Sequence, residues 1–178
     1  LLASSAASDV YKRQSLEQLE EELKDKMKKL YLPQPDEKTG IIPQFDGYFD
    51  LKEIDLSVYK NASVVGTIFH DYSGEDVQKM QAGKQADIVE LLYQMEDITT
   101  PDNKAKNYVY YEARTLHDSS LSKAIHSITA CDLGMEKEAY EMFMSAALTD
   151  LGQEMKSSDA GIHSANMGCL LYTSPSPR

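Results

Sequence analysis

Cysteine is scarce in this sequence, which has only Cys131 and Cys169 in 178 residues. Two unclustered cysteines are too few for a disulfide framework or for a cysteine-rich zinc site. The four histidines show no H-x-x-x-H spacing, so we predict no metal site. Cys131 falls on an apolar helical stripe, which predicts a small core residue in a reducing, cytoplasmic compartment.

Long apolar runs and positive charge are also lacking. No run approaches the roughly 20 residues that a membrane-spanning helix needs. The chain has 18 Lys and Arg residues against 29 Asp and Glu residues, a net charge of −11. Such an acidic chain is a poor match for nucleic acid or an anionic membrane, so we expect neither as a partner.

Three nucleotide-binding and catalytic motifs are missing. The sequence has no Walker-type or Rossmann glycine loop and no G-x-S-x-G nucleophile elbow. Their absence argues against a nucleotide-binding enzyme of these types and against a serine hydrolase built on that elbow.

The two ends read as translated sequencing adapter. Residues 4–14 are SSAASDVYKRQ and residues 169–178 are CLLYTSPSPR, and the two strings match opposite strands of one adapter. We therefore interpret 1–14 and 169–178 as adapter-derived tails and 15–168 as the insert. The insert has 15 basic and 28 acidic side chains, a net charge of −13. Disordered polar tails are the alternative.

Periodicity in the insert predicts a mainly α fold. Apolar residues at three- and four-residue steps predict a helix from Leu16 that Pro33 ends. Further helices are predicted at 74–96, 121–133 and 136–151. A capping box of Ser73 and Asp76 opens the first of these, and Gly134 and Gly152 occupy C′ positions after the other two.

The segments between these helices are predicted to be irregular. Residues 36–72 form a long loop with aromatic clusters, and loops of that length are usually functional. Residues 99–106 read as a polar linker that leads into a strand-like aromatic segment at Tyr110. A last turn is predicted at 157–159. The helix pairs suggest stacked antiparallel hairpins, without a fixed repeat period.

The segment YYEARTLHDSSLS, residues 110–122, holds the first candidate site. Asp118 or Ser119 can cap the helix that follows, and the same amide-rich helix start suits an anion such as phosphate. Glu112 and Asp118 could form an acid/base pair, but a carboxylate after an aromatic segment is a weak signal.

Two more segments carry candidate ligands. Lys84 is predicted near the middle of the apolar stripe of the 74–96 helix, beside Gln85, where a lysine either extends its amine to solvent or meets an anion. His163 follows the turn at 157–159, where a histidine is either a structural hydrogen-bonding group or an anion ligand. Together, an amine, an amide, two hydroxyls and an imidazole suit a phosphate-using site.

Five segments in this order resemble glycoside hydrolase family 65, which holds the maltose, trehalose, kojibiose and nigerose phosphorylases. They are IIPQFDGYFDL, VVGTIFHDY, GKQADIV, YYEARTLHDSSLSKAIHSI and MKSSDAGIHSANMG. The resemblance implies that 15–168 is part of an (α/α)6 barrel catalytic domain. It also implies inverting phosphorolysis of an α-glucosyl disaccharide by inorganic phosphate, without a cofactor, to give β-glucose 1-phosphate.

The same resemblance assigns roles to individual residues. Lys84 and Gln85 match the family pair that holds the glucosyl unit, and Ser119, Ser120 and His163 match the phosphate ligands. The general-acid Glu of the family lies upstream of this segment, so no catalytic residue is assigned here. Ala113 departs from the family pattern, in which a Pro often follows the Glu. The resemblance implies a homodimer for the full protein, and we expect the piece alone to be inactive.

Two other functions stay open at this point. A hydrolase of the same family would use a carboxylate base in place of phosphate. A non-catalytic helical module, either a helical-repeat interaction surface or a sugar-binding relic, would use the paired helices as a binding surface.

Overall fold

The computed structural model describes residues 16–60, 62, 64–151 and 161–173, and it divides into two compact units, Leu1–Leu32 and Pro33–Arg178. The first unit holds helix α2, Leu16–Lys29, as the periodicity predicted. Ion pairs at i and i+4, such as Lys24 with Glu20 at 2.5 Å, line its surface. Its apolar face is exposed: Leu23 has 51% of its surface accessible.

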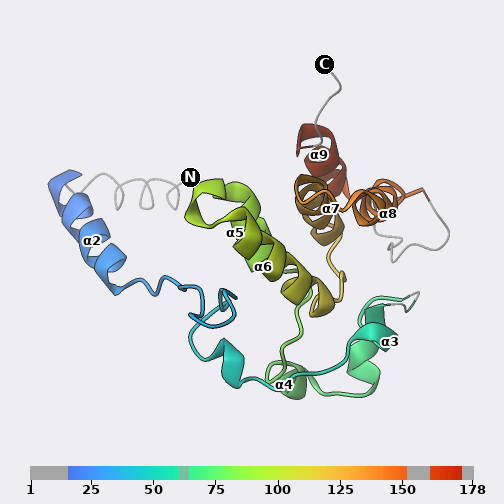
Figure 1. Cartoon of the computed structure of the whole chain (residues 1–178), viewed down its shortest axis with the longest axis horizontal. Helices are drawn as coiled ribbons and strands as arrows, with labels where there is room; N and C mark the ends of the chain where they lie inside the picture. The colour runs from blue at the N-terminus through green and yellow to red at the C-terminus, as the bar shows by residue number, and fades with distance from the viewer. Residues whose placement is uncertain (1–15, 61, 63, 152–160, 174–178) are drawn as a thin grey trace, which may run out of the picture. The chain divides into compact units, whose positions relative to one another are not determined.

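The second unit is a set of helices joined by ordered loops, and it confirms the mainly α fold class, consistent with a fragment of an α/α barrel (Figure 1). Its principal helices are α5 (Asp87–Gln94), α6 (Pro101–Ala113), α7 (Ser122–Asp132), α8 (Glu136–Ala147) and α9 (Ser164–Thr173). Helices α7, α8 and α9 contact one another, and α5 contacts both α6 and α7. No strand pairing occurs in the described residues beyond two isolated parallel bridges, Lys52 with Met80 and Gly83 with Thr115.

The α7–α8 connection follows the predicted pattern. Gly134 has a φ of 72°, so it adopts the left-handed conformation that glycine tolerates best. The amide of Met135 donates to the carbonyl of Ala130 at 2.9 Å, and the amide of Gly134 donates to that of Cys131 at 3.0 Å. These two bonds form a Schellman motif, which ends α7 and starts the return into α8.

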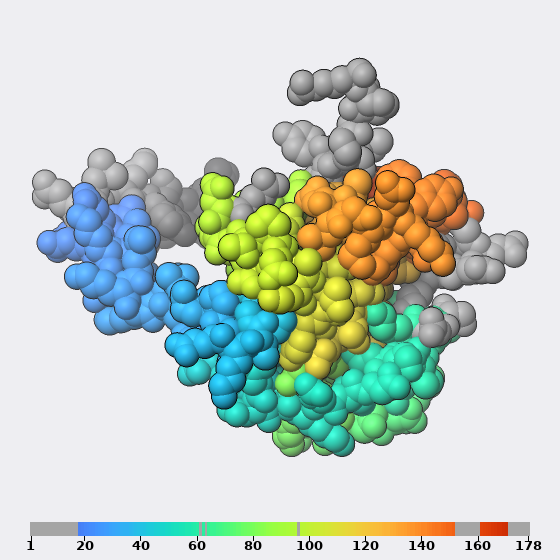
Figure 2. Space-filling model, in the orientation of Figure 1, coloured from blue at the N-terminus to red at the C-terminus, as the bar shows by residue number. Residues whose placement is uncertain are grey.

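Short helical turns are the helical elements among the described residues of the long loop from 36 to 72: η1 (Tyr48–Asp50), α3 (Ser57–Lys60) and η2 (Thr67–His70). Buried Ile41, Ile42 and Tyr48 attach its first part to the core formed with α5 and α6. In Figure 2 the blue and cyan atoms of this loop lie directly against the yellow-green atoms of α6. The first part of the loop, which holds these three residues, therefore packs as part of the unit.

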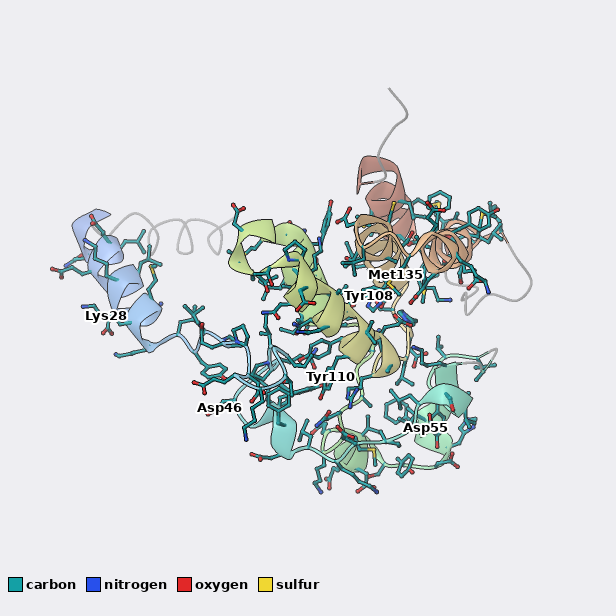
Figure 3. The ribbon with its side chains drawn as sticks, in the orientation of Figure 1. Lys28, Asp46, Asp55, Tyr108, Tyr110 and Met135 are labelled. Atoms are coloured by element: carbon teal, nitrogen blue, oxygen red, sulfur yellow. The ribbon has the colours of Figure 1, made fainter. Side chains whose placement is uncertain are left out.

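Helix α6 corrects two predictions, because it replaces both the 99–106 linker and the strand-like segment at Tyr110. The hydroxyl of Thr100 accepts from the amide of Asn103 at 3.3 Å, and Pro101 occupies the first helical turn, where its missing amide hydrogen costs nothing. Tyr108 donates to Glu138 of α8, and Tyr110 donates to Gln81. Figure 3 labels these two tyrosines on α6. The two hydroxyls thus connect α6 to two different parts of the unit by hydrogen bonds.

The predicted helix at 74–96 is also wrong, since it is broken into α4 (Gly74–Val77) and α5. The Ser73–Asp76 capping box is present at its start. Met80 and Gly83 then pair with residues outside the helix, which draws the backbone away from helical hydrogen bonding. Lys84 therefore lies in a loop and is exposed, not on an apolar stripe.

Three smaller predictions are corrected as well. Helix α8 ends at Ala147 rather than at 151. Cys131 is exposed, because its position in the last turn of α7 faces away from the core. Neither Asp118 nor Ser119 caps α7: its N-cap is Leu121, without a side-chain bond, and the carboxylate of Asp118 accepts from the amide of Gly66 at 3.1 Å.

Gly152 and the predicted turn at 157–159 lie outside the described residues. Helix α9 (Ser164–Thr173) crosses the predicted boundary between the insert, which ends at residue 168, and the adapter tail, which begins at residue 169. The adapter origin of 1–14 and 169–178 stays a prediction that the sequence of the parent gene tests. Across the described residues, no helix combines the length and the apolarity that crossing a membrane requires.

Candidate active site

A small cavity brings together three of the five predicted ligands. Ser119, Ser120 and His163 all line it, and its volume is about 150 Å³. We call it the serine cavity. At about 30 Å³ for each water molecule, it holds a few waters, so its size suits a small oxyanion better than a sugar ring. The other residues around it are Lys60, Ala62, Val65, His117, Asp118, Lys123, Ser145 and Thr149.

The serines reach the cavity from the loop between α6 and α7. Ser119 and Ser120 are partly buried, and the carbonyl of Ser119 accepts from the amide of Ser122 at 3.1 Å. That bond tightens the loop immediately before α7 begins. The two hydroxyls are therefore short side chains on a well-connected turn rather than on a long flexible arm.

His163 reaches the same cavity from the residue that precedes α9. Its Nδ1 lies 2.6 Å from Oδ1 of Asp150, and its backbone amide donates to Oδ2 at 2.7 Å. The hydrogen bond from the imidazole is the main reason that the pKa of Asp150 is lowered. Because Asp150 accepts from both the ring and the backbone amide of His163, it fixes the orientation of the imidazole in the cavity wall.

Lys84 and Gln85, the other two predicted ligands, do not line the serine cavity. Gln85 lines a second cavity of about 100 Å³ with Ser122 and His126, which we call the Gln85 cavity, and Lys84 lines neither cavity. The backbone still brings this segment close to the serine loop, because Gly83 accepts from Leu116 at 2.8 Å and donates to Arg114 at 2.9 Å. Lys84 and Gln85 thus directly follow Gly83, which is hydrogen-bonded to the segment that leads to Ser119.

A buried network separates the two cavities. Glu112 lies at its centre: one carboxylate oxygen is 2.5 Å from Nδ1 of His126, and both are 3.1 Å from Nε2 of His117. Nδ1 of His117 is 3.0 Å from the hydroxyl of Ser122. Lys60 adds a third donor at 2.7 Å. Sequence analysis considered Glu112 only as an acid/base candidate, because its pairing with His117, His126 and Lys60 arises from tertiary contacts.

The charge states in this network follow from burial and hydrogen bonding. Burial lowers the pKa of His117 to about 4, against the opposing pull of Glu112, so the ring is neutral at pH 7. Burial alone would raise the pKa of Glu112, but hydrogen bonds from His117 and His126 outweigh it and hold that pKa far below its ordinary value. Since an ionised carboxylate only accepts, Nε2 of His117 carries the proton and Ser122 donates to Nδ1.

Glu112, His117 and His126 also offer three ligand atoms within 4.8 Å of one another, a set that could hold a metal ion. Histidine spacing did not predict this cluster, since its members come from α6, a loop and α7. The same carboxylate accepts an ammonium hydrogen from Lys60, and a cation at this distance opposes a second one. We therefore assign the cluster to hydrogen bonding.

A larger open groove lies apart from these residues. It measures about 1050 Å³ and is lined by residues such as Phe49, Val109, Tyr110 and Arg114. None of the five predicted ligands lines it. Size alone therefore does not identify the site, and the convergence of hydroxyls, imidazole and ammonium groups favours the serine cavity.

The depressed pKa of His117 predicts a loss of stability in acid. The unfolded chain binds a proton at His117 below about pH 6.5, whereas the folded chain binds it only below about pH 4, so stability falls as the pH decreases through this window. The term reaches about 3 kcal/mol at most. Glu112 adds its own loss only below its ordinary pKa, since a lowered carboxyl pKa stabilises above that value.

Thermal unfolding of the full-length protein and of a His117→Gln variant, followed from pH 7 to pH 4, measures this term. The stability gap between the two proteins should narrow as the pH falls, because only the wild type carries the penalty. His70→Gln, at an exposed position, is the control and should keep a constant gap. If the stability difference between the wild type and His117→Gln also stays constant from pH 7 to pH 4, the lowered pKa of His117 is contradicted.

The chain is similar to known proteins over nearly its whole length. Residues 2–172 match the family model described as the glycosyl hydrolase family 65 central catalytic domain. Kojibiose phosphorylase of Halothermothrix orenii is 47% identical over 148 residues, which are 83% of this chain and 18% of that protein. Kojibiose phosphorylase of Escherichia coli K12 is 40% identical over 146 residues, 81% of this chain and 19% of that protein.

A solved structure gives the same result at the level of the fold. It is provisionally assigned as a kojibiose phosphorylase from the human microbiome and superposes with a TM-score of 0.67 at 30% sequence identity. The match covers 80% of this chain and 20% of that one. The chain thus spans about a fifth of the length of the relatives it matches.

Proposed function

Because the chain belongs to glycosyl hydrolase family 65, we propose that it is part of the catalytic domain of an inverting disaccharide phosphorylase, the parent enzyme. The substrates would be an α-glucosyl disaccharide and inorganic phosphate. The observation that supports this most is the convergence of Ser119, Ser120 and His163 on one oxyanion-sized cavity, although residues 119 and 163 lie far apart in sequence. Family membership also makes a helical-repeat module the weaker reading.

In the proposed reaction, a phosphate oxygen attacks the anomeric carbon of the glucosyl unit. The bond from that carbon to the glycosidic oxygen breaks, and a general acid protonates the departing sugar. The phosphate ends on the opposite face of the ring, so an α-glucoside gives β-glucose 1-phosphate. The general acid would come from a part of the parent enzyme upstream of this chain, and Glu112, already bonded to three donors, does not take that role.

The serine cavity would hold the phosphate before attack. Hydroxyl groups on a tight loop and an imidazole fixed by Asp150 are donors that need little rearrangement when the anion arrives, which is how a preorganised site lowers a barrier. Lys60 and Lys123 also line the cavity and add positive charge near the ion. Lys84 and Gln85 would bind the glucosyl unit.

The direct test is the phosphate dependence of cleavage by the parent enzyme. Kojibiose, nigerose, maltose and trehalose are each incubated with and without inorganic phosphate, and the products are identified by anomer-resolved NMR. We expect β-glucose 1-phosphate from at least one disaccharide, and only when phosphate is present. Free glucose released without phosphate would refute the proposal.

Release of free glucose without phosphate would indicate a hydrolase, which is the second candidate function. Asp118 lines the serine cavity, and its carboxylate is the kind of group that a hydrolase uses to activate water. It accepts from the amide of Gly66, which holds it in place. If cleavage is independent of phosphate, Asp118→Asn should abolish it.

Asp150 gives a prediction for phosphate binding. In Asp150→Asn the ring and the backbone amide of His163 lose the ionised carboxylate that holds them in place, so we expect the phosphate KM of the parent enzyme to rise about tenfold, the value of one weakened charge-assisted hydrogen bond. Asp132→Asn is the matched control, since Asp132 pairs with Lys104 outside the cavity. Equal phosphate KM values for the two variants would show that Asp150 does not contribute to phosphate binding.

Lys84 gives a prediction for sugar binding. Replacing its ammonium in Lys84→Met should lower kcat/KM for the disaccharide by about ten- to a hundredfold, the range for a hydrogen bond to a charged group. Lys79→Met, which removes an exposed lysine from the same stretch, should leave kcat/KM unchanged. Because Lys84 is exposed in this structure, the folded state should survive; equal activity would reject the assignment.

A further inference from the structure

We propose that Glu112 is the positioning residue of the phosphate site: its carboxylate holds together the three chain segments that form or support the serine cavity. Glu112 does not line that cavity itself, so it would act through its neighbours rather than by touching phosphate. The inference rests on the proposed function, because it concerns how that site is shaped.

The three donors come from three separate segments of the chain. Lys60 ends the short helix α3, His117 precedes the serines in their loop, and His126 lies in α7. All three bond the Glu112 side chain, at 2.7, 3.1 and 2.5 Å respectively. Lys60 also donates to the backbone carbonyl of Glu112. Segments more than 50 residues apart in sequence are thus joined at one carboxylate.

Two of these three donors form the wall of the serine cavity. Lys60 and His117 line it, whereas His126 lines the Gln85 cavity on the other side of the network. Loss of the carboxylate would therefore loosen both wall segments: Lys60 would keep only its bond to the backbone carbonyl of Glu112, and the serine loop would lose the bond to His117. His126 anchors the carboxylate to α7, the helix that the serine loop enters.

The backbone of His117 shows why the serine loop needs this anchor. Its φ is 54°, and among the described residues it is the one non-glycine with a positive φ. That conformation is unfavourable for a residue with a side chain and persists only where the surroundings enforce it. Hydrogen bonds at both ring nitrogens, to Glu112 and to Ser122, enforce it here. Asp118, Ser119 and Ser120 follow directly.

A glutamine at this position separates charge from shape. It has nearly the same size as glutamate, but it offers one carbonyl oxygen and one NH₂ group. Three donors converge on the carboxylate, so in Glu112→Gln at least one of them meets another donor or loses its partner. Because the Glu112 side chain is only 15% exposed, water cannot easily replace that partner.

The test is the kinetics of Glu112→Gln in the parent enzyme. We expect the phosphate KM to rise at least about tenfold, while the disaccharide KM changes by no more than about twofold. The dissociation constant of inorganic phosphate, measured by calorimetry on the folded variant, should rise in parallel. Glu138→Gln is the matched control: it removes a partly buried carboxylate bonded to Tyr108, outside both cavities, and should leave phosphate binding unchanged.

A merely structural role would give a different result. It would lower the melting temperature and the active fraction, but the folded fraction would bind phosphate as the wild type does, and that outcome overturns the inference. If Glu112→Gln cannot be obtained folded, Glu112→Asp keeps the charge and withdraws it by one methylene. A raised phosphate KM in Glu112→Asp supports the inference, and an unchanged one overturns it.

Failure of this inference can be told from failure of the proposed function. If the wild-type parent enzyme cleaves disaccharides without phosphate, both the proposed function and this inference are contradicted. A wild-type enzyme that needs phosphate, together with a Glu112→Gln variant of unchanged phosphate KM, removes the inference alone.

Discussion

The double variant Ser119→Ala, Ser120→Ala of the parent enzyme should raise the phosphate KM about a hundredfold or more. Each hydroxyl would donate to a phosphate oxygen, and a hydrogen bond to a charged group is worth about 1.5–3 kcal/mol. Two such losses correspond to a factor of about 10² to 10⁴ at about 1.4 kcal/mol per tenfold. The fold should survive, since both side chains lie on a loop and end at the cavity.

Ser127→Ala is the matched control for that experiment. Ser127 is buried in α7 and donates to the carbonyl of Ala139 at 2.8 Å, but it does not line the serine cavity. Its loss should reduce stability and leave the phosphate KM as it is. A double variant whose phosphate KM matches that of the control would reject the two serines as phosphate ligands.

The largest expected effect on stability belongs to Asn107. This side chain is fully buried on α6 and bonds the long loop twice: it accepts from the amide of Ile42 at 2.8 Å and donates to the carbonyl of Gly40 at 2.9 Å. Asn107→Ala leaves both backbone groups without these partners, at about 1–3 kcal/mol for each. We expect the attachment of residues 36–48 to weaken by about 3–5 kcal/mol.

Hydrogen–deuterium exchange on the parent enzyme measures that change locally. Amides of residues 36–48 should exchange at least about a hundredfold faster in Asn107→Ala, while those of α7 and α8 change less. Lys106→Ala, on the neighbouring residue, breaks only an exposed ion pair with Asp102 and should have little effect. Equal exchange in the two variants would show that Asn107 does not hold the loop.

Local patterns predicted the helices that local interactions decide. Helices α2, α7 and α8 were found from their apolar periodicity, and the starts of α4 and of the α7–α8 turn from a capping box and a glycine. These features depend on neighbours within a few residues. Sequence alone therefore contains the information that fixes them.

The errors occur where tertiary contacts override local signals. Helix α6 buries Asn107, Tyr108 and Tyr111 rather than an aliphatic stripe. Its polar start was therefore interpreted as a linker, although Thr100 and Pro101 are good helix-start residues. The 74–96 helix is interrupted because Gly83 pairs with a segment about 30 residues later. No periodicity within either segment reveals those partners.

The candidate site divides in the same way. Ser119, Ser120 and His163 were identified in the sequence by their chemistry and by resemblance, and the structure places them in one cavity. The groups that orient them were missed: Asp150 beside His163, and the Glu112 network behind the serine loop. Their distances along the chain follow no helical spacing, so only the fold shows that they meet.

The most direct measurement is a crystal structure of the parent enzyme with bound phosphate. The account predicts a phosphate ion in the serine cavity, within hydrogen-bonding distance of the hydroxyls of Ser119 and Ser120 and of the imidazole of His163. An ion bound elsewhere, with that cavity left to water at saturating phosphate, would contradict it.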